Sequence, residues 1–142
     1  MDSLLGVLGL GTDLVEVDRF RLAMERQGER LLDRLFSDAE RAYAFRHKNP
    51  APRLAARFGA KEAVMKALGV GLWKFALRDV EVVRLPSGQP TVALYEKASV
   101  LAEARGVTAW HLTLTHTDSM AAATAIALGA GAPGIGAPGG AR

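Results

Sequence analysis

The sequence of 142 residues contains no cysteine. This absence excludes disulfides, cysteine zinc sites, iron–sulfur clusters and cysteine nucleophiles. The three histidines, His47, His111 and His116, are not spaced as a zinc-binding set. No apolar run reaches the roughly 20 residues of a membrane helix, and the apolar segment 4–17 is interrupted by glycines and acidic residues, unlike a signal peptide. We therefore expect a cytoplasmic protein without membrane partners.

Aromatic residues are also scarce, at 6% of the sequence, and no basic strand carries interleaved Phe or Tyr. This pattern disfavours single-stranded nucleic acid as a partner. The chain has the length of one domain, and its 49% hydrophobic and 23% charged residues are ordinary for a globular protein. We expect a single domain over residues 1–128. Residues 129–142 are almost entirely Gly, Ala and Pro and predict a disordered tail.

Positive charge is concentrated in one part of the chain. The net charge is only +3, but residues 19–78 hold 14 Lys and Arg against 6 Asp and Glu. Such a segment attracts phosphates or acidic protein surfaces, although solvated helix faces would explain it equally well. A non-catalytic module that binds nucleotides or nucleic acid remains the alternative. Magnesium dependence would discriminate, because electrostatic binding to a polyanion needs no metal site.

The hydrophobic pattern predicts an α+β fold with a largely antiparallel sheet packed against helices. Asp18 is expected to cap the first helix, and Ser37 to open the third through a capping box. The prolines at 50 and 52 mark a break. The expected elements are, in order, a strand at 4–17, helices at 18–27, 29–36, 37–46 and 53–68, strands at 79–85 and 91–95, a helix at 96–104, and strands at 110–115 and 121–128.

Two carboxylates are candidates for chemistry. Asp13 lies inside a strand rich in Gly and Leu, where burying it is costly unless it is paired or binds a cation. Glu62 shares a helix face with Lys66, at the edge of the apolar stripe. Asp13 and Glu62 could hold magnesium, which takes one or two carboxylates and keeps waters and phosphate oxygens. Two plainer interpretations stay open: a turn or capping role for Asp13, and a surface Glu62–Lys66 pair worth about 0.3–0.5 kcal/mol.

Further charged residues lie near these carboxylates in the predicted fold. Arg53, Arg57 and Lys61 share another flank of the same helix, where they repel one another unless an anion is present. His116 follows a strand, where it can donate to a phosphate or act as acid or base. The pattern indicates a phosphate-bearing ligand, with magnesium, on a basic domain, but names no reaction.

Three segments resemble the motifs of the holo-acyl-carrier-protein synthases, in the same order: GLGTDLVEVDRF at 9–20, RFGAKEAVMKALG at 57–69 and LTLTHTD at 112–118. The resemblance covers about residues 5–128. It implies a 4′-phosphopantetheinyl transferase of fatty acid biosynthesis. Such enzymes move the phosphopantetheine arm of coenzyme A to a serine of apo acyl carrier protein and release adenosine 3′,5′-bisphosphate. Short members are homotrimers with active sites between subunits. Longer members hold two such halves in one chain, and this chain resembles a single half.

The resemblance also implies roles for individual residues. Asp13 and Glu62 match the magnesium ligands, and Lys66 matches a lysine that contacts the phosphates or assists proton transfer. The serine proton would pass to Glu62, directly or through a water. Residues expected to contact coenzyme A are Arg57, His116, Lys48, Arg53 and, at a turn bordering the nucleotide, Gly88 and Pro90.

Two further positions follow from the same resemblance. Arg19 and Arg26 match positions on the first helix that meet the acidic carrier protein. Gly59 replaces a usual alanine, which weakens the helix by up to about 1 kcal/mol. We expect this glycine to permit the close approach of a neighbouring backbone.

Overall fold

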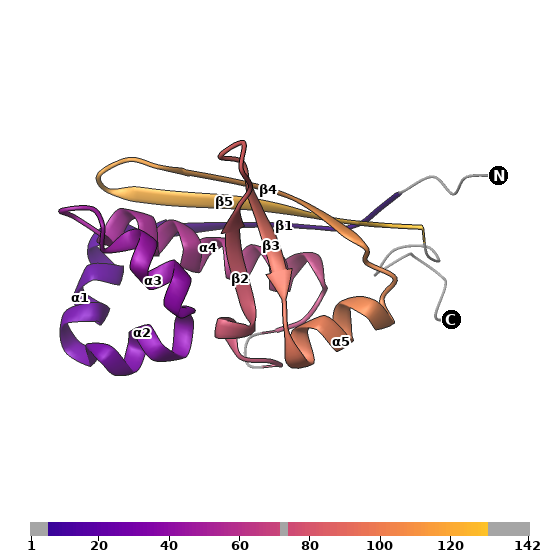
Figure 1. The fold of residues 1–142 in the computed structure, drawn as a ribbon, viewed down its shortest axis with the longest axis horizontal. Coiled ribbons are helices and arrows are strands. Elements are labelled where there is room, and N and C mark those ends of the chain that lie inside the picture. Colours follow the sequence, from indigo (N-terminus) through magenta and orange to yellow (C-terminus); the bar gives the residue numbers. More distant parts are fainter. Residues whose placement is uncertain (1–5, 72–73, 131–142) are drawn as a thin grey trace.

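The computed structural model describes residues 6–71 and 74–130. It confirms the predicted α+β class (Figure 1). The elements are β1 (Gly6–Glu16), α1 (Val17–Gln27), α2 (Glu29–Leu35), α3 (Asp38–Ala44), α4 (Ala51–Ala67), a short 3-10 turn (Leu77–Asp79), β2 (Val80–Arg84), β3 (Pro90–Leu94), α5 (Glu96–Ala104), β4 (Ala109–His116) and β5 (Met120–Gly129).

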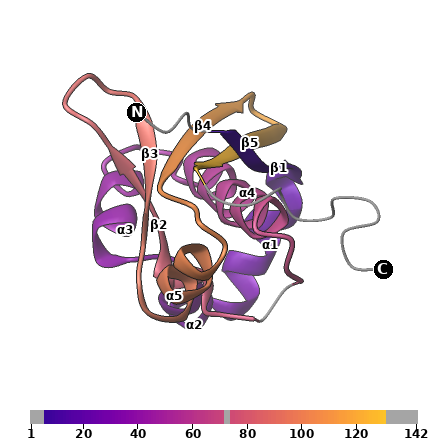
Figure 2. The same cartoon turned by 90° about the vertical axis from the view of Figure 1, so that its right-hand side faces the viewer.

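Both sheets of the described chain are antiparallel. The larger has the strand order β1-β5-β4, and β2 and β3 form a separate hairpin. The central strand β5 alternates strictly, with alanines at 121, 123, 125 and 127 buried against α4. Because alanine is small, the helix lies close against this face of the sheet (Figure 2).

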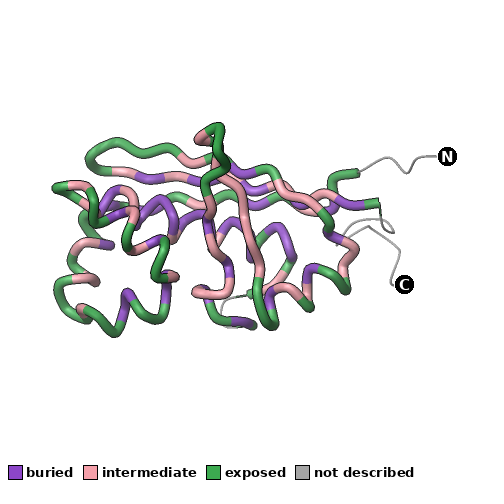
Figure 3. Tube along the Cα trace, viewed as in Figure 1, coloured by how far each residue is buried: buried purple, intermediate pink, exposed green. Residues whose placement is uncertain are grey.

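The helix α4 is the centre of the fold. It is buried along most of its length, between the three-stranded sheet on one side and α1, α3 and the hairpin on the other (Figure 3). Figure 1 places α1, α2 and α3 at one end of the molecule and α5 at the other. None of the described helices is long and apolar enough to cross a membrane.

Most element boundaries differ from expectation by one or two residues, and two of the differences have a clear physical cause. Asp18 does not cap α1. The helix begins one residue earlier, the Val17 N–H donates to the Ser119 carbonyl at 2.9 Å, and Asp18 lies in the first turn, where negative charge is favourable. The helix α4 begins at Ala51 within the expected break, because proline is tolerated in a first helical turn.

Other local predictions are confirmed. Ser37 and Glu40 form both hydrogen bonds of the capping box that opens α3. The predicted disordered tail, 129–142, begins one residue too early, because Gly129 is the last residue of β5 and pairs with Gly6. Residues 131–142 lie outside the described residues.

Candidate active site

Two glycines bring β1 into direct contact with α4. A Cβ at Gly9 would lie 1.8 Å from the Ala67 carbonyl oxygen, and one at Gly11 would lie 1.9 Å from that of Ala63. No side chain fits at either position. Two residues of a strand and four of a helix advance by similar lengths, about 6–7 Å, so the contacts repeat along both elements. The next strand residue on this face is Asp13.

The third glycine of this contact behaves differently from our expectation. A Cβ at Gly59 would meet side-chain atoms, Val15 Cγ2 at 3.3 Å and Asp13 Oδ2 at 3.7 Å, and no backbone within 3.4 Å. The close backbone approach predicted for Gly59 is therefore wrong for that residue, and it occurs at the two strand glycines instead. Gly59 leaves a small space beside the Asp13 carboxylate.

Asp13, Glu62 and Lys66 come together where β1 crosses α4, as predicted. The Lys66 Nζ donates to Asp13 Oδ1 at 3.2 Å and to the Thr12 carbonyl at 2.9 Å. The Asp13 side chain is 17% exposed, whereas that of Lys66 is 54% exposed. The alternative interpretation of Glu62 and Lys66 as an isolated surface ion pair is wrong, because Lys66 bonds to Asp13 across the contact between α4 and β1.

The electrostatics of Glu62 indicate a place for a cation. Burial raises the pKa of Glu62 above its ordinary value, and the negative charge of Asp13 raises it further, while Lys66 acts in the opposite direction. A like charge that raises a carboxyl pKa would stabilise a bound cation. Two carboxylates are also the number that magnesium takes when phosphate and water supply its other ligands. The donor set therefore fits magnesium, although the described residues contain no group of three or more metal-ligating side chains.

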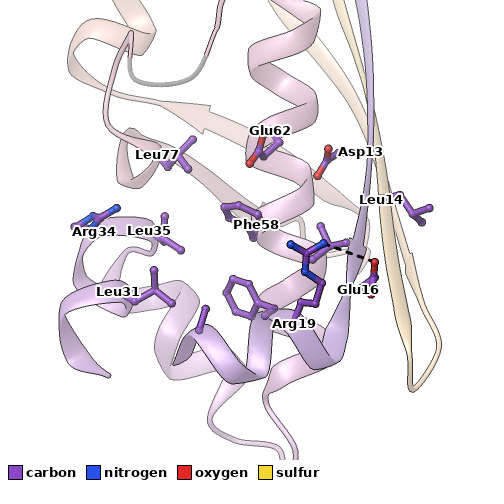
Figure 4. A pocket seen from close by; sticks show the side chains of 13 residues that line it. Asp13, Leu14, Glu16, Arg19, Leu31, Arg34, Leu35, Phe58, Glu62 and Leu77 are labelled. Atoms are coloured by element: carbon purple, nitrogen blue, oxygen red, sulfur yellow. Dashed lines mark ion pairs between the residues drawn. The ribbon is translucent and has the colours of Figure 1, made fainter. Parts of the chain in front are cut away.

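A cavity of about 510 Å³ opens beside these carboxylates (Figure 4). Asp13 and Glu62 lie at one end of it, and Arg19, with its ion pair to Glu16, lies at another. Its apolar wall includes Phe20 and Phe58, whose ring centroids are 5.4 Å apart. The other lining residues are Leu14, Val15, Ala23, Leu31, Arg34, Leu35 and Leu77.

The first helix presents positive charge to solvent next to this cavity. Arg19 is strongly exposed, and its contact to Glu16 is loose, at 3.9 Å. Arg26, in the last turn of α1, is exposed and forms no ion pair with any residue that the structure describes. Exposed guanidinium groups of this kind can dock an acidic protein surface.

An ion pair lies buried on the opposite side of α4. Lys61 is fully buried, and its Nζ donates to Glu40 Oε1 at 2.8 Å, to the Leu77 carbonyl at 3.1 Å and to the Val80 carbonyl. Glu40 also accepts from the backbone N–H groups of Ser37 and Val82, each within 2.9 Å. Sequence analysis predicts an anion beside the row Arg53, Arg57 and Lys61. For Lys61, this anion is the Glu40 carboxylate of the protein itself.

Sequence reasoning missed this network. Glu40 was recognised only as a capping-box residue, and nothing in the spacing shows that its carboxylate also reaches α4 and β2. The network fixes α4 against the hairpin, one residue away from Glu62.

Other predicted residues lie away from the carboxylates. Arg57 is buried and borders a different cavity, with α3 and β2. His116 is the exposed last residue of β4, and its cross-strand row, through Ala121 to Val15, places it on the sheet face that carries α4. Gly88, with φ +91°, shapes the β2–β3 turn, and Pro90 begins β3.

The remaining cations, Lys48 and Arg53, flank the start of α4. Neither forms an ion pair within the described part of the chain. In the described chain Lys66 bonds to Asp13, and Asp13, Glu62 and Arg19 line one cavity. The other predicted coenzyme A contacts do not line this cavity: Arg57, His116, Lys48, Arg53, Gly88 and Pro90.

The chain combines a basic α+β fold with two carboxylates suited to a metal and several free cations, which are the features of a protein that handles phosphate esters. Residues 9–125 match the 4′-phosphopantetheinyl transferase superfamily. The chain belongs to this superfamily.

Named relatives agree with this assignment. A holo-acyl-carrier-protein synthase of Desulforudis audaxviator is 48% identical over 87% of this chain and 94% of that protein. Another, of Gloeobacter violaceus, is 42% identical over 84% of this chain and 92% of that protein.

Solved structures are also similar. The acyl carrier protein synthase of Plasmodium yoelii with ADP bound has a TM-score of 0.81 at 27% identity, over 89% of this chain and 98% of the other. The Bacillus anthracis holo-acyl-carrier-protein synthase, in complex with coenzyme A (3′,5′-ADP), has a TM-score of 0.71 at 25% identity, over 87% of this chain and 97% of the other.

Proposed function

We propose that this protein is a holo-acyl-carrier-protein synthase. It transfers the 4′-phosphopantetheine group of coenzyme A to a serine of apo acyl carrier protein and releases adenosine 3′,5′-bisphosphate. The family membership and the names of relatives at 42–48% identity support the activity. The observation that carries it in this chain is the meeting of Asp13, Glu62 and Lys66 beside an open cavity. On the same grounds we propose that the protein acts in fatty acid biosynthesis, in the cytoplasm.

The proposed site would act by positioning the reactants and by stabilising negative charge. The serine hydroxyl attacks the β-phosphorus of coenzyme A, and the P–O bond to the nucleotide breaks, so negative charge grows on the leaving phosphate. Lys66 would stabilise this charge from its place one turn beyond Glu62. Asp13 and Glu62 would hold Mg²⁺, which when bound neutralises pyrophosphate oxygens. Glu62, with its raised pKa, would take the serine proton directly or through a water.

We further propose that the active unit is a homotrimer with its sites between subunits. The outer face of the β1-β5-β4 sheet supports this arrangement: Leu10 and Leu14 are 64% and 67% exposed, and no described element covers them (Figures 1 and 2). An uncovered apolar sheet face is typical of an interface. The separation of Arg57 and the β2–β3 turn from the carboxylates supports it as well, since a neighbouring subunit would supply the missing half.

Arg19 and Arg26 are proposed to dock the acidic carrier protein. Both arginines are exposed on α1, and Arg19 lines the cavity that holds Asp13 and Glu62, so a carrier docked there would have its serine near the carboxylates. Because such attraction is screened by salt, carrier binding should weaken as ionic strength rises.

Intact-mass spectrometry tests the proposed reaction. Apo acyl carrier protein is incubated with the protein, coenzyme A and Mg²⁺, beside a matched sample with EDTA. We expect the carrier to gain about 340 Da, the mass of the phosphopantetheine arm, only with Mg²⁺. No gain with several carrier proteins would refute the activity and favour a coenzyme A or polyanion binder.

A further inference from the structure

A fully buried ion pair joins α4 to the elements on the side opposite β1. The side chains of Lys61 and Glu40 are both 0% exposed, and the Lys61 Nζ donates to Glu40 Oε1 at 2.8 Å. The same ammonium group donates to the carbonyls of Leu77, at 3.1 Å, and of Val80. Glu40 in turn accepts from the backbone N–H of Val82 at 2.9 Å. Each of the three ammonium hydrogens therefore has an acceptor.

Stability alone does not explain such a pair. Removing two charges from water is costly, and apolar side chains of similar volume often stabilise a fold equally well. An apolar pair would lack directional bonds, however. The hydrogen bonds of Lys61 and Glu40 hold α3, α4, the short 3-10 turn and β2 at defined positions relative to one another. The pair therefore suits a place in the fold where the placement of side chains matters more than stability.

Leu77 connects this network to the candidate active site. Its carbonyl accepts from Lys61, and its side chain lines the cavity that also contains Asp13 and Glu62. Figure 4 shows Leu77 on the side of Glu62 that faces away from Asp13. Leu77 is buried, whereas Glu62 is half-buried. The wall of the cavity beside Glu62 thus includes a residue that Lys61 holds in place.

The position of Lys61 in the helix suits this task. Lys61 and Glu62 are consecutive, and one residue turns an α-helix by about 100°. Lys61 therefore reaches β2 while Glu62 faces the cavity. On the other side of α4, the backbone of Ala63 contacts β1 at Gly11. The helix is thus held from two sides next to Glu62, by the strand backbone and by the buried pair.

We propose that Lys61 and Glu40 are positioning residues for Glu62: their buried pair fixes α4 to the segment of Leu77 and so sets where the Glu62 carboxylate lies in the cavity. The inference rests on the proposed function, in which Glu62 acts on the reactants. Lys61 and Glu40 are not among the residues that line this cavity, whereas Leu77 and Glu62 are. The pair therefore acts on the reaction through the placement of other side chains and not by contact with a substrate.

Steady-state kinetics on two buried-site variants, assayed well below the Tm of each, test this role. Lys61→Met should lower kcat by about 100-fold, because a small misplacement of a reacting group can cost that much. The KM of the carrier protein should stay about the same, since α1 is untouched. Leu54→Ala is the matched control, because Leu54 is equally buried on α4 but does not line the cavity. It should lower the Tm and leave kcat nearly unchanged. An unchanged kcat in Lys61→Met, or an equal loss in both variants, would overturn the proposal.

Leu77→Ala tests the route by which the pair acts, and it does so even if Lys61→Met fails to fold, because it leaves the buried pair intact. It should lower kcat by about tenfold, since the wall beside Glu62 is lost. In the double variant with Lys61→Met, the loss should be smaller than the product of the two single losses, because residues that act through one another are not additive. A fully active Leu77→Ala, or losses that multiply, would contradict the assignment.

A spectroscopic measurement separates this inference from the transferase activity. The side-chain carboxyl ¹³C resonance of Glu62, assigned by its loss in Glu62→Gln, is recorded at one pH without Mg²⁺ or coenzyme A. We expect Lys61→Met and Leu77→Ala to move this resonance toward that of exposed glutamates, and Leu54→Ala to leave it in place. A wild type that modifies no carrier protein would refute the proposed function, and the resonance would still report the placement of Glu62. An unmoved resonance in Lys61→Met would refute the positioning role.

Discussion

Replacing Gly11 by alanine tests whether the strand–helix contact positions the carboxylates. The new Cβ would lie 1.9 Å from the Ala63 carbonyl oxygen, whereas ordinary contacts begin at 3.4 Å. One of the two backbones must therefore move by about 1.5 Å, since neither neighbour is a side chain that can rotate away. This movement separates β1, which carries Asp13, from α4, which carries Glu62.

The magnitude follows from the same contact. Overpacking of a core costs about 1–3 kcal/mol, and contacts with backbone lie at the upper end. The loss of glycine entropy in the unfolded chain returns about 0.4–1 kcal/mol. We expect Gly11→Ala to lower the free energy of unfolding by about 2–2.6 kcal/mol, or the Tm by about 7–9 °C at this length.

Gly59→Ala is the matched control, because a Cβ there meets only side-chain atoms at 3.3–3.9 Å. It should be neutral, or stabilise the protein by up to about 1 kcal/mol through helix propensity. The assays are urea unfolding and carrier modification measured well below the Tm. If Gly11→Ala matched the wild type in both stability and transfer, our explanation of the site's geometry would be refuted.

Four further predictions concern the site and its assembly. Glu62→Gln should abolish transfer without lowering the Tm, as measured by carrier mass and thermal unfolding; near-normal turnover would remove Glu62 from the metal site. Arg19→Glu should raise the carrier KM at least tenfold and leave that of coenzyme A unchanged, whereas Arg105→Glu, at the far end of the molecule, should do neither; equal effects on both substrates would exclude docking. Because the pKa of Glu62 is raised, its ionised form is disfavoured in the metal-free fold, which gains stability as pH falls through that pKa. The rise in Tm on adding Mg²⁺ should instead grow as pH increases through it. Asp13→Asn should shift the transition of the metal-free protein to lower pH and abolish most of the rise in Tm with Mg²⁺. Leu10→Glu should yield monomers in sedimentation experiments where the wild type is trimeric, and Val100→Glu, an equally exposed site on α5, should not; a trimeric Leu10→Glu protein would place the interface elsewhere.

The sequence was a good guide to local structure. Periodicity, the capping box at Ser37 and the glycines after the helices predicted the order of elements and most boundaries. Its errors were at Asp18 and in the segment before α4. At the start of α1, a long-range hydrogen bond from Val17 to Ser119 decides the boundary. At the start of α4, the first helical turn tolerates proline.

Pairings between distant residues were harder to predict. The sequence allowed the prediction that Asp13 and Glu62 could lie together if the strand packs on the helix. It did not show the cause, which is the backbone contact of Gly9 and Gly11 with α4. Lys61 was taken as one of three cations on one flank of the helix, because a helical wheel shows which residues share a side and not what packs against it. Its partner Glu40 comes from another helix, 21 residues earlier.

The most direct test concerns the division of the site into a carboxylate half and an arginine half on different subunits. Glu62→Gln and Arg57→Met proteins are unfolded together, refolded as a mixture and assayed for carrier modification at low coenzyme A. Each variant alone should be nearly inactive. In mixed trimers about one quarter of the interfaces combine an intact Glu62 with an intact Arg57, so we predict about a quarter of the wild-type activity. A mixture no more active than the two variants alone would show that both residues act within one chain, and would contradict a shared site.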